Sequence, residues 1–158
     1  MGMVTFKIVV TFFLMAAYLT SGSRWYNELG SVMTITKVNF TSGSFAGTYN
    51  SAVGNATKEY ELRGCFDTDG RSLGWVVSYQ NKYLNAHSTA SWSGQIQVTP
   101  GVQKPIILTT WLLTTQSSPP DNWASTNVGF DTFLQQQPDE KTVQLAQLQN
   151  RQSHPANA

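Results

Sequence analysis

The sequence predicts an all-β fold of about eight short strands, and three observations support this. Apolar residues recur at every second position through much of the chain after residue 22. Helical periodicity is scarce in the same region. Turn-forming pairs such as Ser42-Gly43, Asp69-Gly70 and Pro100-Gly101 separate the alternating runs. Short strands at this spacing are typical of a β-sandwich or an up-and-down barrel, and the pattern alone does not choose between them.

The first element along the chain is a predicted signal peptide over residues 1–22. Lys7 precedes an apolar run over residues 8–17, and small residues follow around Ser21. That run is short for a bilayer span, so a short membrane anchor is the weaker interpretation. We therefore expect a secreted, extracellular protein with no membrane attachment after cleavage.

The strands are expected between the turn signals that follow the leader. Within residues 58–66, for example, Tyr60, Leu62 and Phe66 share one face and the charged residues share the other. In chain order the predicted strands are 25–29, 31–38, 44–50, 58–66, 73–80, 90–99, 104–115 and 122–133.

One predicted strand is apolar on both faces. Residues 106–113 read Ile-Ile-Leu-Thr-Thr-Trp-Leu-Leu, which is not the pattern of a strand with one wet face. Val128 and Phe130 extend the same outer surface from the next strand. A second sheet or a second subunit must cover that surface, and in a small barrel only a partner can do so. The run therefore predicts a homo-oligomer.

The composition changes near the end of the predicted barrel domain, residues 23–137. Residues 138–158 form a Gln-rich tail in which Val143, Leu145 and Leu148 give only a faint helical pattern. Because so little apolar area offsets the entropy of ordering, we expect this tail to be disordered. A docking helix is the alternative.

Charge and cysteine content exclude several classes of protein. The formal net charge is +1 with no basic cluster, which argues against a nucleic-acid partner. Cys65 is the single cysteine, so no disulfide forms within the chain. We expect Cys65 to be a buried free thiol, with an intermolecular bridge as the alternative.

Polar side chains lie beside aromatic residues in several segments, which predicts a binding site. In a closed barrel the inward residues of distant strands converge on one cavity. A dry pocket walled by Trp with few polar groups suits a small uncharged ligand. The polar candidates are Asn27, Ser31, Tyr49, Ser51, Asn55, Tyr83, Asn85, His87, Ser88 and Asp131, and the aromatic candidates are Trp75, Tyr79, Trp92, Trp111 and Trp123.

At these residues the sequence resembles the avidin and streptavidin family. The matching segments run in family order with similar spacing, and so long an agreement is not a chance motif. They are residues 25–31, 47–55, 73–75, 85–88, 92–95, 110–113, 122–123 and 128–133. The resemblance implies an eight-stranded antiparallel up-and-down barrel that assembles with its own copies, usually as a tetramer. It also implies non-covalent binding of biotin as the ligand, without a cofactor and without catalysis.

The resemblance further implies a polar cluster around the ureido group of biotin. Asn27, Ser31 and Tyr49 would donate hydrogen bonds to the ureido oxygen. Three donors on one carbonyl oxygen polarise it and strengthen each bond in a dry site. Ser51 and Asp131 would accept from the two ureido N–H groups, and the bond to the carboxylate would be charge-assisted.

The remaining roles carried over by position concern the walls and the rim of the pocket. Trp92 and Trp111 would flank the rings, and Leu29, Val53 and Leu113 would fill gaps around them. Ser88 and Asn55 would contact the valerate carboxylate. Trp123 would enter a neighbouring subunit's pocket.

Two positions depart from the streptavidin pattern. Tyr79 replaces a wall Trp, and Ala90 replaces a Thr whose hydroxyl meets the ring sulfur, a loss of about 1 kcal/mol for one neutral hydrogen bond.

Other functions are less well supported by the residues. A lipocalin-like carrier of another small apolar ligand would share the barrel. A serine hydrolase would use Ser51 or Ser88 with His87 and Asp131, but no Gly-x-Ser-x-Gly motif is present. The histidines and the cysteine have no metal-ligand spacing, so we expect neither an enzyme nor a metal site. Asn39 and Asn55 begin possible N-glycosylation sequons.

Overall fold

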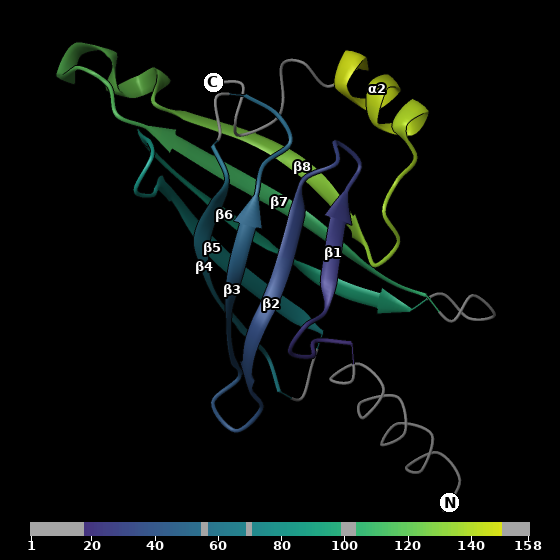
Figure 1. Cartoon of the computed structure of the whole chain (residues 1–158). Coiled ribbons are helices and arrows are strands. Elements are labelled where there is room, and N and C mark those ends of the chain that lie inside the picture. The colour runs from purple at the N-terminus through teal and green to yellow at the C-terminus, as the bar shows by residue number, and fades with distance from the viewer. Residues whose placement is uncertain (1–17, 55–56, 69–70, 99–103, 150–158) are drawn as a thin grey trace, which may run out of the picture.

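The computed structural model describes residues 18–54, 57–68, 71–98 and 104–149 (Figure 1). Within them the strands are β1 (Arg24–Asn27), β2 (Val32–Asn39), β3 (Ser44–Asn50), β4 (Glu59–Phe66), β5 (Ser72–Gln80), β6 (Asn85–Val98), β7 (Pro105–Thr115) and β8 (Thr126–Leu134). A 3-10 helix, η1 (Pro119–Ala124), lies between β7 and β8, and an α-helix, α2 (Glu140–Gln149), follows β8. The predicted signal peptide lies outside these residues except for positions 18–22.

The strands form a closed barrel in which each pairs antiparallel with its neighbour in the chain. Strand β1 closes the ring against β8 through the pairs Tyr26–Leu134 and Asn27–Phe133. The predicted eight-stranded antiparallel up-and-down barrel is therefore confirmed. Because strand direction alternates, the β1–β2, β3–β4, β5–β6 and β7–β8 loops gather at one end, which is the upper end in Figure 1. We call it the upper end below.

The eighth strand begins later than the sequence predicts. Pro119 and Pro120 open η1, where the lack of an N–H group on proline is tolerated but would break a sheet ladder. Trp123 consequently lies in this 3-10 helix, and β8 starts at Thr126.

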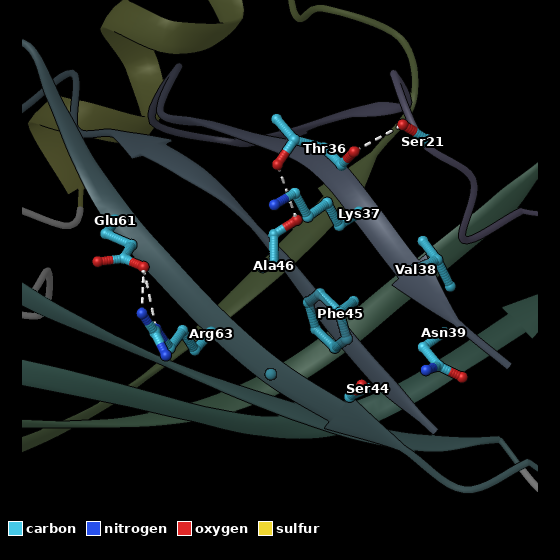
Figure 2. Close-up of a pocket in the computed structure, with 11 residues that line it drawn as sticks. Ser21, Thr36, Lys37, Val38, Asn39, Ser44, Phe45, Ala46, Glu61 and Arg63 are labelled. Atoms are coloured by element: carbon cyan, nitrogen blue, oxygen red, sulfur yellow. Dashed lines mark hydrogen bonds and ion pairs between the residues drawn. The ribbon is translucent and has the colours of Figure 1, made fainter. Parts of the chain in front are cut away.

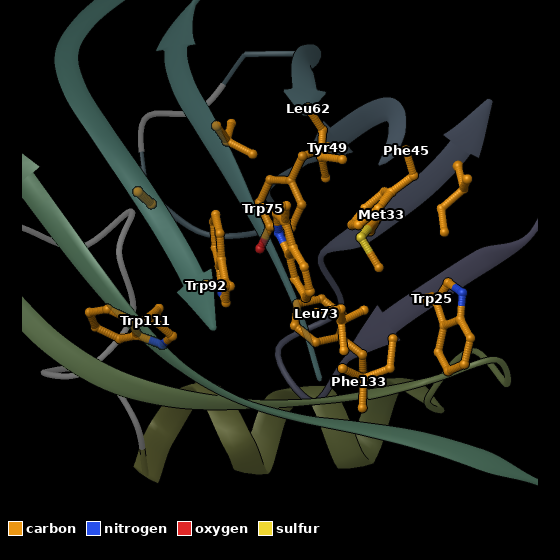
Figure 3. Close-up of a cluster of buried hydrophobic side chains, with 14 of the residues drawn as sticks. Trp25, Met33, Phe45, Tyr49, Leu62, Leu73, Trp75, Trp92, Trp111 and Phe133 are labelled. Atoms are coloured by element: carbon orange, nitrogen blue, oxygen red, sulfur yellow. The ribbon is translucent and has the colours of Figure 1, made fainter. Parts of the chain in front are cut away.

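Aromatic and aliphatic side chains fill the interior of the barrel (Figure 3). The rings of Trp75 and Trp92 stack at 5.6 Å, and Phe133 meets Trp75 edge-on at 5.3 Å. Such pairs add about 0.5–1.5 kcal/mol each to the free energy gained by burying their area. These ring contacts join residues of β5, β6 and β8 in the core. Strands β5 and β8 are not neighbours in the sheet, so side-chain packing rather than strand pairing connects them.

Strand β7 is apolar on both faces, as its sequence predicted. Ile107, Trp111 and Leu113 are buried inside, whereas Leu108 and Leu112 are exposed outside. In the ladders, Leu112 pairs with Ser91 on β6 and with Val128 on β8. The outer surface formed by Val76, Leu108, Leu112, Val128 and Phe130 is called the β5–β8 patch below. Phe130, the most exposed member, shows 74% of its surface.

Cys65 is exposed, so the expectation of a buried thiol is wrong. Strand β4 buries Tyr60 and Leu62, and successive side chains of a strand point to opposite faces. An odd-numbered residue in this strand therefore faces outward, as Cys65 does.

Helix α2 corrects the expectation of disorder from residue 138, at least over residues 140–149. Asp139 caps the helix, because its Oδ1 accepts from the backbone N–H of Thr142 at 2.8 Å. Gln147 then contacts the barrel through its Nε2, which donates to the carbonyl of Leu29 at 3.2 Å. The apolar residues of this segment are too few to form a core of their own. Their apolar area therefore did not predict that the helix docks on the barrel. In the segments that the structure describes, no helix is long and apolar enough to cross a membrane.

Residues 18–22, which the sequence assigns to the leader, pack on the barrel. Leu19 is 3% exposed and belongs to the core cluster. Ser21 Oγ donates to the carbonyl of Thr36 at 2.7 Å, and the Gly22 N–H donates to the carbonyl of Ile35 at 2.7 Å. Leu19, Ser21 and Gly22 therefore contact the barrel, although they precede the predicted start of the domain at residue 23.

A secreted chain that begins at Tyr18 is expected to be more stable than one that begins at Ser23. Loss of a buried Leu side chain costs about 2–5 kcal/mol, and Leu19→Ala in the longer chain is expected to reproduce most of this loss. Urea unfolding measures both, with Leu145→Ala, at a half-exposed position on α2, as the control. Equal unfolding free energies for the two chains would restore the predicted boundary at residue 22.

Candidate ligand-binding site

Among the described residues, five polar side chains are buried inside the barrel: Asn27, Ser31, Ser51, Thr109 and Asp131. Polar groups buried among aromatic rings are costly unless they are hydrogen-bonded or await a polar ligand. All but Thr109 were candidates from the sequence. Their partners therefore decide what this region can bind.

The β1–β2 loop fixes the Asn27 side chain. Asn27 Oδ1 accepts from the backbone N–H of Ser31 at 2.8 Å and from that of Leu29 at 3.2 Å. Gly30 adopts φ 88°, a left-handed conformation that glycine takes without strain and that lets the loop turn this tightly. Since the loop uses the amide oxygen, the side-chain hydrogen bond between Asn27 and the Asp131 carboxyl group comes from the amide N–H groups, which face the interior.

A second contact joins this loop to the β3–β4 loop. Ser31 Oγ accepts from the backbone N–H of Ala52 at 3.1 Å. Ser51 Oγ donates to the carbonyl of Val53 at 3.0 Å and accepts from the Val53 N–H at 3.5 Å, which leaves one lone pair to accept from a ligand. Val53 is half-buried beside them, while Asn55 lies outside the described residues, so its role stays a prediction.

Asp131, on β8, is 2% exposed and is held from two sides. Its Oδ2 accepts from the indole N–H of Trp92 at 2.7 Å, and its backbone carbonyl accepts from Thr109 Oγ1 at 2.9 Å. Within the described part of the chain, Oδ1 has no hydrogen-bond partner. One carboxylate oxygen is thus fixed and the other is positioned to accept from a donor.

Burial raises the pKa of Asp131 from its ordinary 3.8 to about 7. The hydrogen bond from Trp92 opposes this rise, the negative charge of Glu28 adds to it, and Asn27 and Trp111 lower the pKa. Glu28 is itself held, because its Oε2 accepts from the backbone N–H of Thr132 at 3.0 Å. Near neutral pH the carboxyl group is therefore poised between its two protonation states.

Tyrosines and tryptophans wall the same region. The rings of Tyr49 and Trp92 lie 5.1 Å apart, and those of Tyr60 and Tyr79 meet edge-on at 5.2 Å. Burial raises the pKa of Tyr49 and of Tyr79, so both phenols remain protonated donors at neutral pH. Among the described residues the Tyr79 hydroxyl has no hydrogen-bond partner.

Strand register completes the wall. Trp92 lies directly opposite Trp111 in the β6–β7 ladder, and Ala90 lies opposite Leu113. All four side chains are buried, as is Leu29 in the β1–β2 loop. The barrel thus brings together the predicted candidates Asn27, Leu29, Ser31, Tyr49, Ser51, Tyr79, Trp92, Trp111, Leu113 and Asp131 as buried residues of one interior.

Two predicted residues stand apart from this interior. Trp123, on η1, is 86% exposed and lies outside the core of its own chain. Ser88 is half-buried near the start of β6. A single chain therefore does not supply the whole set that the sequence predicted.

The arrangement offers no support to the hydrolase alternative. His87 is exposed and has a left-handed φ of 51°. In the described ranges no hydrogen bond joins it to Ser51, Ser88 or Asp131, and no group of three or more His, Cys, Asp or Glu residues gathers as metal ligands would.

Sequence reasoning missed three residues that shape the site. Thr109 supports the Asp131 backbone, Glu28 shifts the pKa of its carboxyl group, and Tyr60 packs on Tyr79. The alternation of β7 was a usable signal for Thr109, because a threonine on the inward face between Ile107 and Trp111 needs a partner.

An open cleft of about 810 Å³ with mixed polar and apolar lining lies elsewhere, along β2, β3 and β4 (Figure 2). Its lining includes the exposed ion pair of Arg63 and Glu61. Asn39, a predicted glycosylation position, is exposed at its edge, and Asn39 Oδ1 accepts from the backbone N–H groups of Thr41 and Ser42. None of the barrel-interior candidates lines this cleft.

Comparison with known proteins agrees with this geometry. The model of the avidin family matches residues 15–136, which is more than half of the chain. The chain belongs to the avidin family. Among its avidin-family relatives in Gallus gallus, "Avidin" is 33% identical over 114 residues, which cover 70% of this chain and 74% of that protein. "Avidin-related protein 1" is 35% identical over 123 residues, covering 72% of this chain and 75% of that protein. "Avidin-related protein 3" is 32% identical over a segment of the same length.

Proposed function

We propose that this protein binds and sequesters biotin non-covalently in the interior of its barrel. The observation that carries the proposal is the buried polar set Asn27, Ser31, Tyr49, Ser51 and Asp131 among aromatic walls. These are the positions to which the resemblance assigned the ureido contacts. Burial strengthens such hydrogen bonds, and the contacts that hold the side chains in place reduce the entropy lost on binding.

The hydrogen bonds within the site agree in direction with the roles proposed. The β1–β2 loop occupies Oδ1 of Asn27, so the amide N–H groups, which also serve Asp131, are the atoms that would donate to the ureido oxygen. Asp131 keeps Oδ1 as an acceptor for a ureido N–H, because Trp92 occupies Oδ2. Ser51 accepts through its oxygen while it donates to Val53. The donors and acceptors thus match an uncharged urea.

The functional unit that we propose is a homotetramer. The β5–β8 patch gathers five exposed apolar side chains on neighbouring strands, and clustered exposed apolar residues of this kind mark interaction surfaces. Trp123 projects from η1 with 86% of its surface exposed, which suits a residue that completes a neighbouring subunit's pocket. Ser88 and Asn55 would complete the rim at the valerate carboxylate.

We further propose that the protein is secreted and that Asn39 carries any N-linked glycan. Asn39 is exposed at the β2–β3 turn, whereas Asn55 belongs to the loop that would cover the bound ligand. A glycan on Asn55 would hinder the carboxylate contact, so we expect that residue to stay unmodified.

Titration of the purified oligomer with biotin tests the proposed function. We expect one biotin per chain, quenching of Trp fluorescence, and an upward shift of the unfolding temperature at stoichiometric ligand. Fatty acids are the matched control, because a lipocalin-like carrier would respond to them instead. A chain that ignores biotin in both measurements overturns the proposal.

A further inference from the structure

Helix α2 lies against the upper end of the barrel, beside the loop that joins β1 to β2 (Figure 1). Two contacts define its position. Gln147 Nε2 donates to the Leu29 carbonyl at 3.2 Å. Val143 is so close to Gly30 that a Cβ on that glycine would lie 3.4 Å from the Val143 Cγ1 and 3.6 Å from the Cβ of Ala52. The helix therefore contacts the β1–β2 loop at two neighbouring residues, and Ala52 of the β3–β4 loop also lies beside Gly30.

The face that α2 turns to the barrel has the spacing expected of a docked helix. Val143, Ala146 and Gln147 are half-buried, and they recur at intervals of three and four residues. Leu145 and Leu148, on the remaining surface, are 50% and 63% exposed. A helix of ten residues is marginal by itself in water, so these contacts, with the Asp139 cap, hold it in place.

The loop that α2 contacts is bonded to the β3–β4 loop, and the two loops carry Ser31 and Ser51, to which the proposed function assigns ureido contacts. Ser31 follows Gly30 directly, and its Oγ already accepts from the N–H of Ala52, the residue after Ser51. Movement of either loop would displace Ser31 and Ser51 together. A brace on the β1–β2 loop restricts that movement directly at Ser31 and, through the bond from Ala52 to Ser31, in the β3–β4 loop.

We propose that α2 is a brace that positions the ligand-binding loops, with Val143 and Gln147 as its positioning residues, and that it slows the release of bound ligand. The inference rests on the proposed binding of biotin. Undocking of α2 frees the β1–β2 and β3–β4 loops to open, so it acts on dissociation more than on association.

The experiment compares the full chain with Gln147→Ala, Val143→Asp and a matched control, Gln144→Ala, which changes an exposed residue of the same helix. We expect biotin dissociation to become about two- to tenfold faster in Gln147→Ala, the range for one neutral hydrogen bond. Val143→Asp puts a charge against Gly30 and Ala52, so we expect a larger increase. The association rate and the unfolding temperature of the ligand-free protein should change little in any variant.

Amide hydrogen exchange of the ligand-free protein provides a readout that does not require biotin. Residues 28–31 and 51–53 should lose protection in Gln147→Ala and Val143→Asp but not in Gln144→Ala. Unchanged dissociation rates in variants that bind biotin overturn the brace. A wild-type chain that ignores biotin overturns the proposed function instead, and unchanged exchange in the two loops then overturns the brace as well.

Discussion

Replacement of Leu112 by arginine is expected to break the proposed homotetramer into smaller species. Leu112 lies near the centre of the β5–β8 patch, between Ser91 and Val128 in the ladders, and it is partly exposed in the single chain. If a second copy of the chain covers the patch, the arginine guanidinium is buried in the interface without an opposite charge beside it. Such burial costs about 3–5 kcal/mol of association free energy. That cost weakens association by more than roughly a hundredfold. Light scattering during size-exclusion chromatography measures the change in mass.

The matched control is Thr36→Arg, which adds the same charge to an exposed position on β2. Thr36→Arg should leave the mass unchanged. The monomeric species formed by Leu112→Arg should also bind biotin more weakly, because Trp123 would no longer reach a neighbouring pocket. A Leu112→Arg protein with the mass of the wild type would show that another surface forms the interface.

Replacement of Asp131 by alanine is expected to weaken biotin binding by roughly 10- to 150-fold, which corresponds to about 1.5–3 kcal/mol for a hydrogen bond to a charged group. The variant loses the acceptor at Oδ1 and leaves the Trp92 indole N–H without its partner. Displacement calorimetry measures the affinity. Glu61→Gln, which removes an exposed carboxylate on β4, is the control and should bind like the wild type.

The same carboxyl group should make binding depend on pH. A ureido N–H needs an acceptor, so biotin prefers the ionised form of Asp131, whose pKa in the ligand-free protein is about 7. Affinity should therefore fall as the pH decreases below 7, by up to about tenfold per unit. Asp131→Asn keeps an acceptor oxygen but does not titrate, so it should bind better than Asp131→Ala and show no such pH dependence.

The stability of the ligand-free protein should show the opposite trend. Folding raises the pKa of Asp131 from 3.8 to about 7, so the folded state binds this proton more tightly than the unfolded state. The contribution of Asp131 to the unfolding free energy is most favourable below pH 4 and is lost as the pH rises through 7. Thermal unfolding of wild type and Asp131→Asn between pH 4 and 8 isolates the effect. Identical pH profiles for the two proteins would show that the carboxyl group does not carry the raised pKa.

Much of the site was predictable from local patterns. Alternation at every second residue placed Tyr49, Trp92 and Trp111 on inward faces, because a strand sends successive side chains to opposite sides. The same rule would have placed Cys65 outside, had it been applied from Leu62. The chain order of the candidates pointed to the family, which the comparisons bear out.

Other features depend on residues that are distant in sequence. Asp139, a typical helix-capping residue, was a local signal for the start of α2. The docking of the helix depends on the contact of Gln147 with Leu29, and these residues are 118 positions apart in the sequence. The burial of Leu19 likewise depends on core residues far along the chain, so the sequence of the leader did not indicate it.

By itself, then, the sequence determined the strands, their inward and outward faces, and the types of polar groups that enter the interior. These properties follow from residue types and spacings within a few positions of one another. Tertiary structure decided the register in which β1 and β8 close the ring, the burial and the Trp92 and Glu28 contacts that set the acidity of Asp131, and the docking of α2 on the β1–β2 loop. The physical reason is that closure, burial and electrostatic coupling are sums over neighbours in space, and a linear pattern does not specify those neighbours.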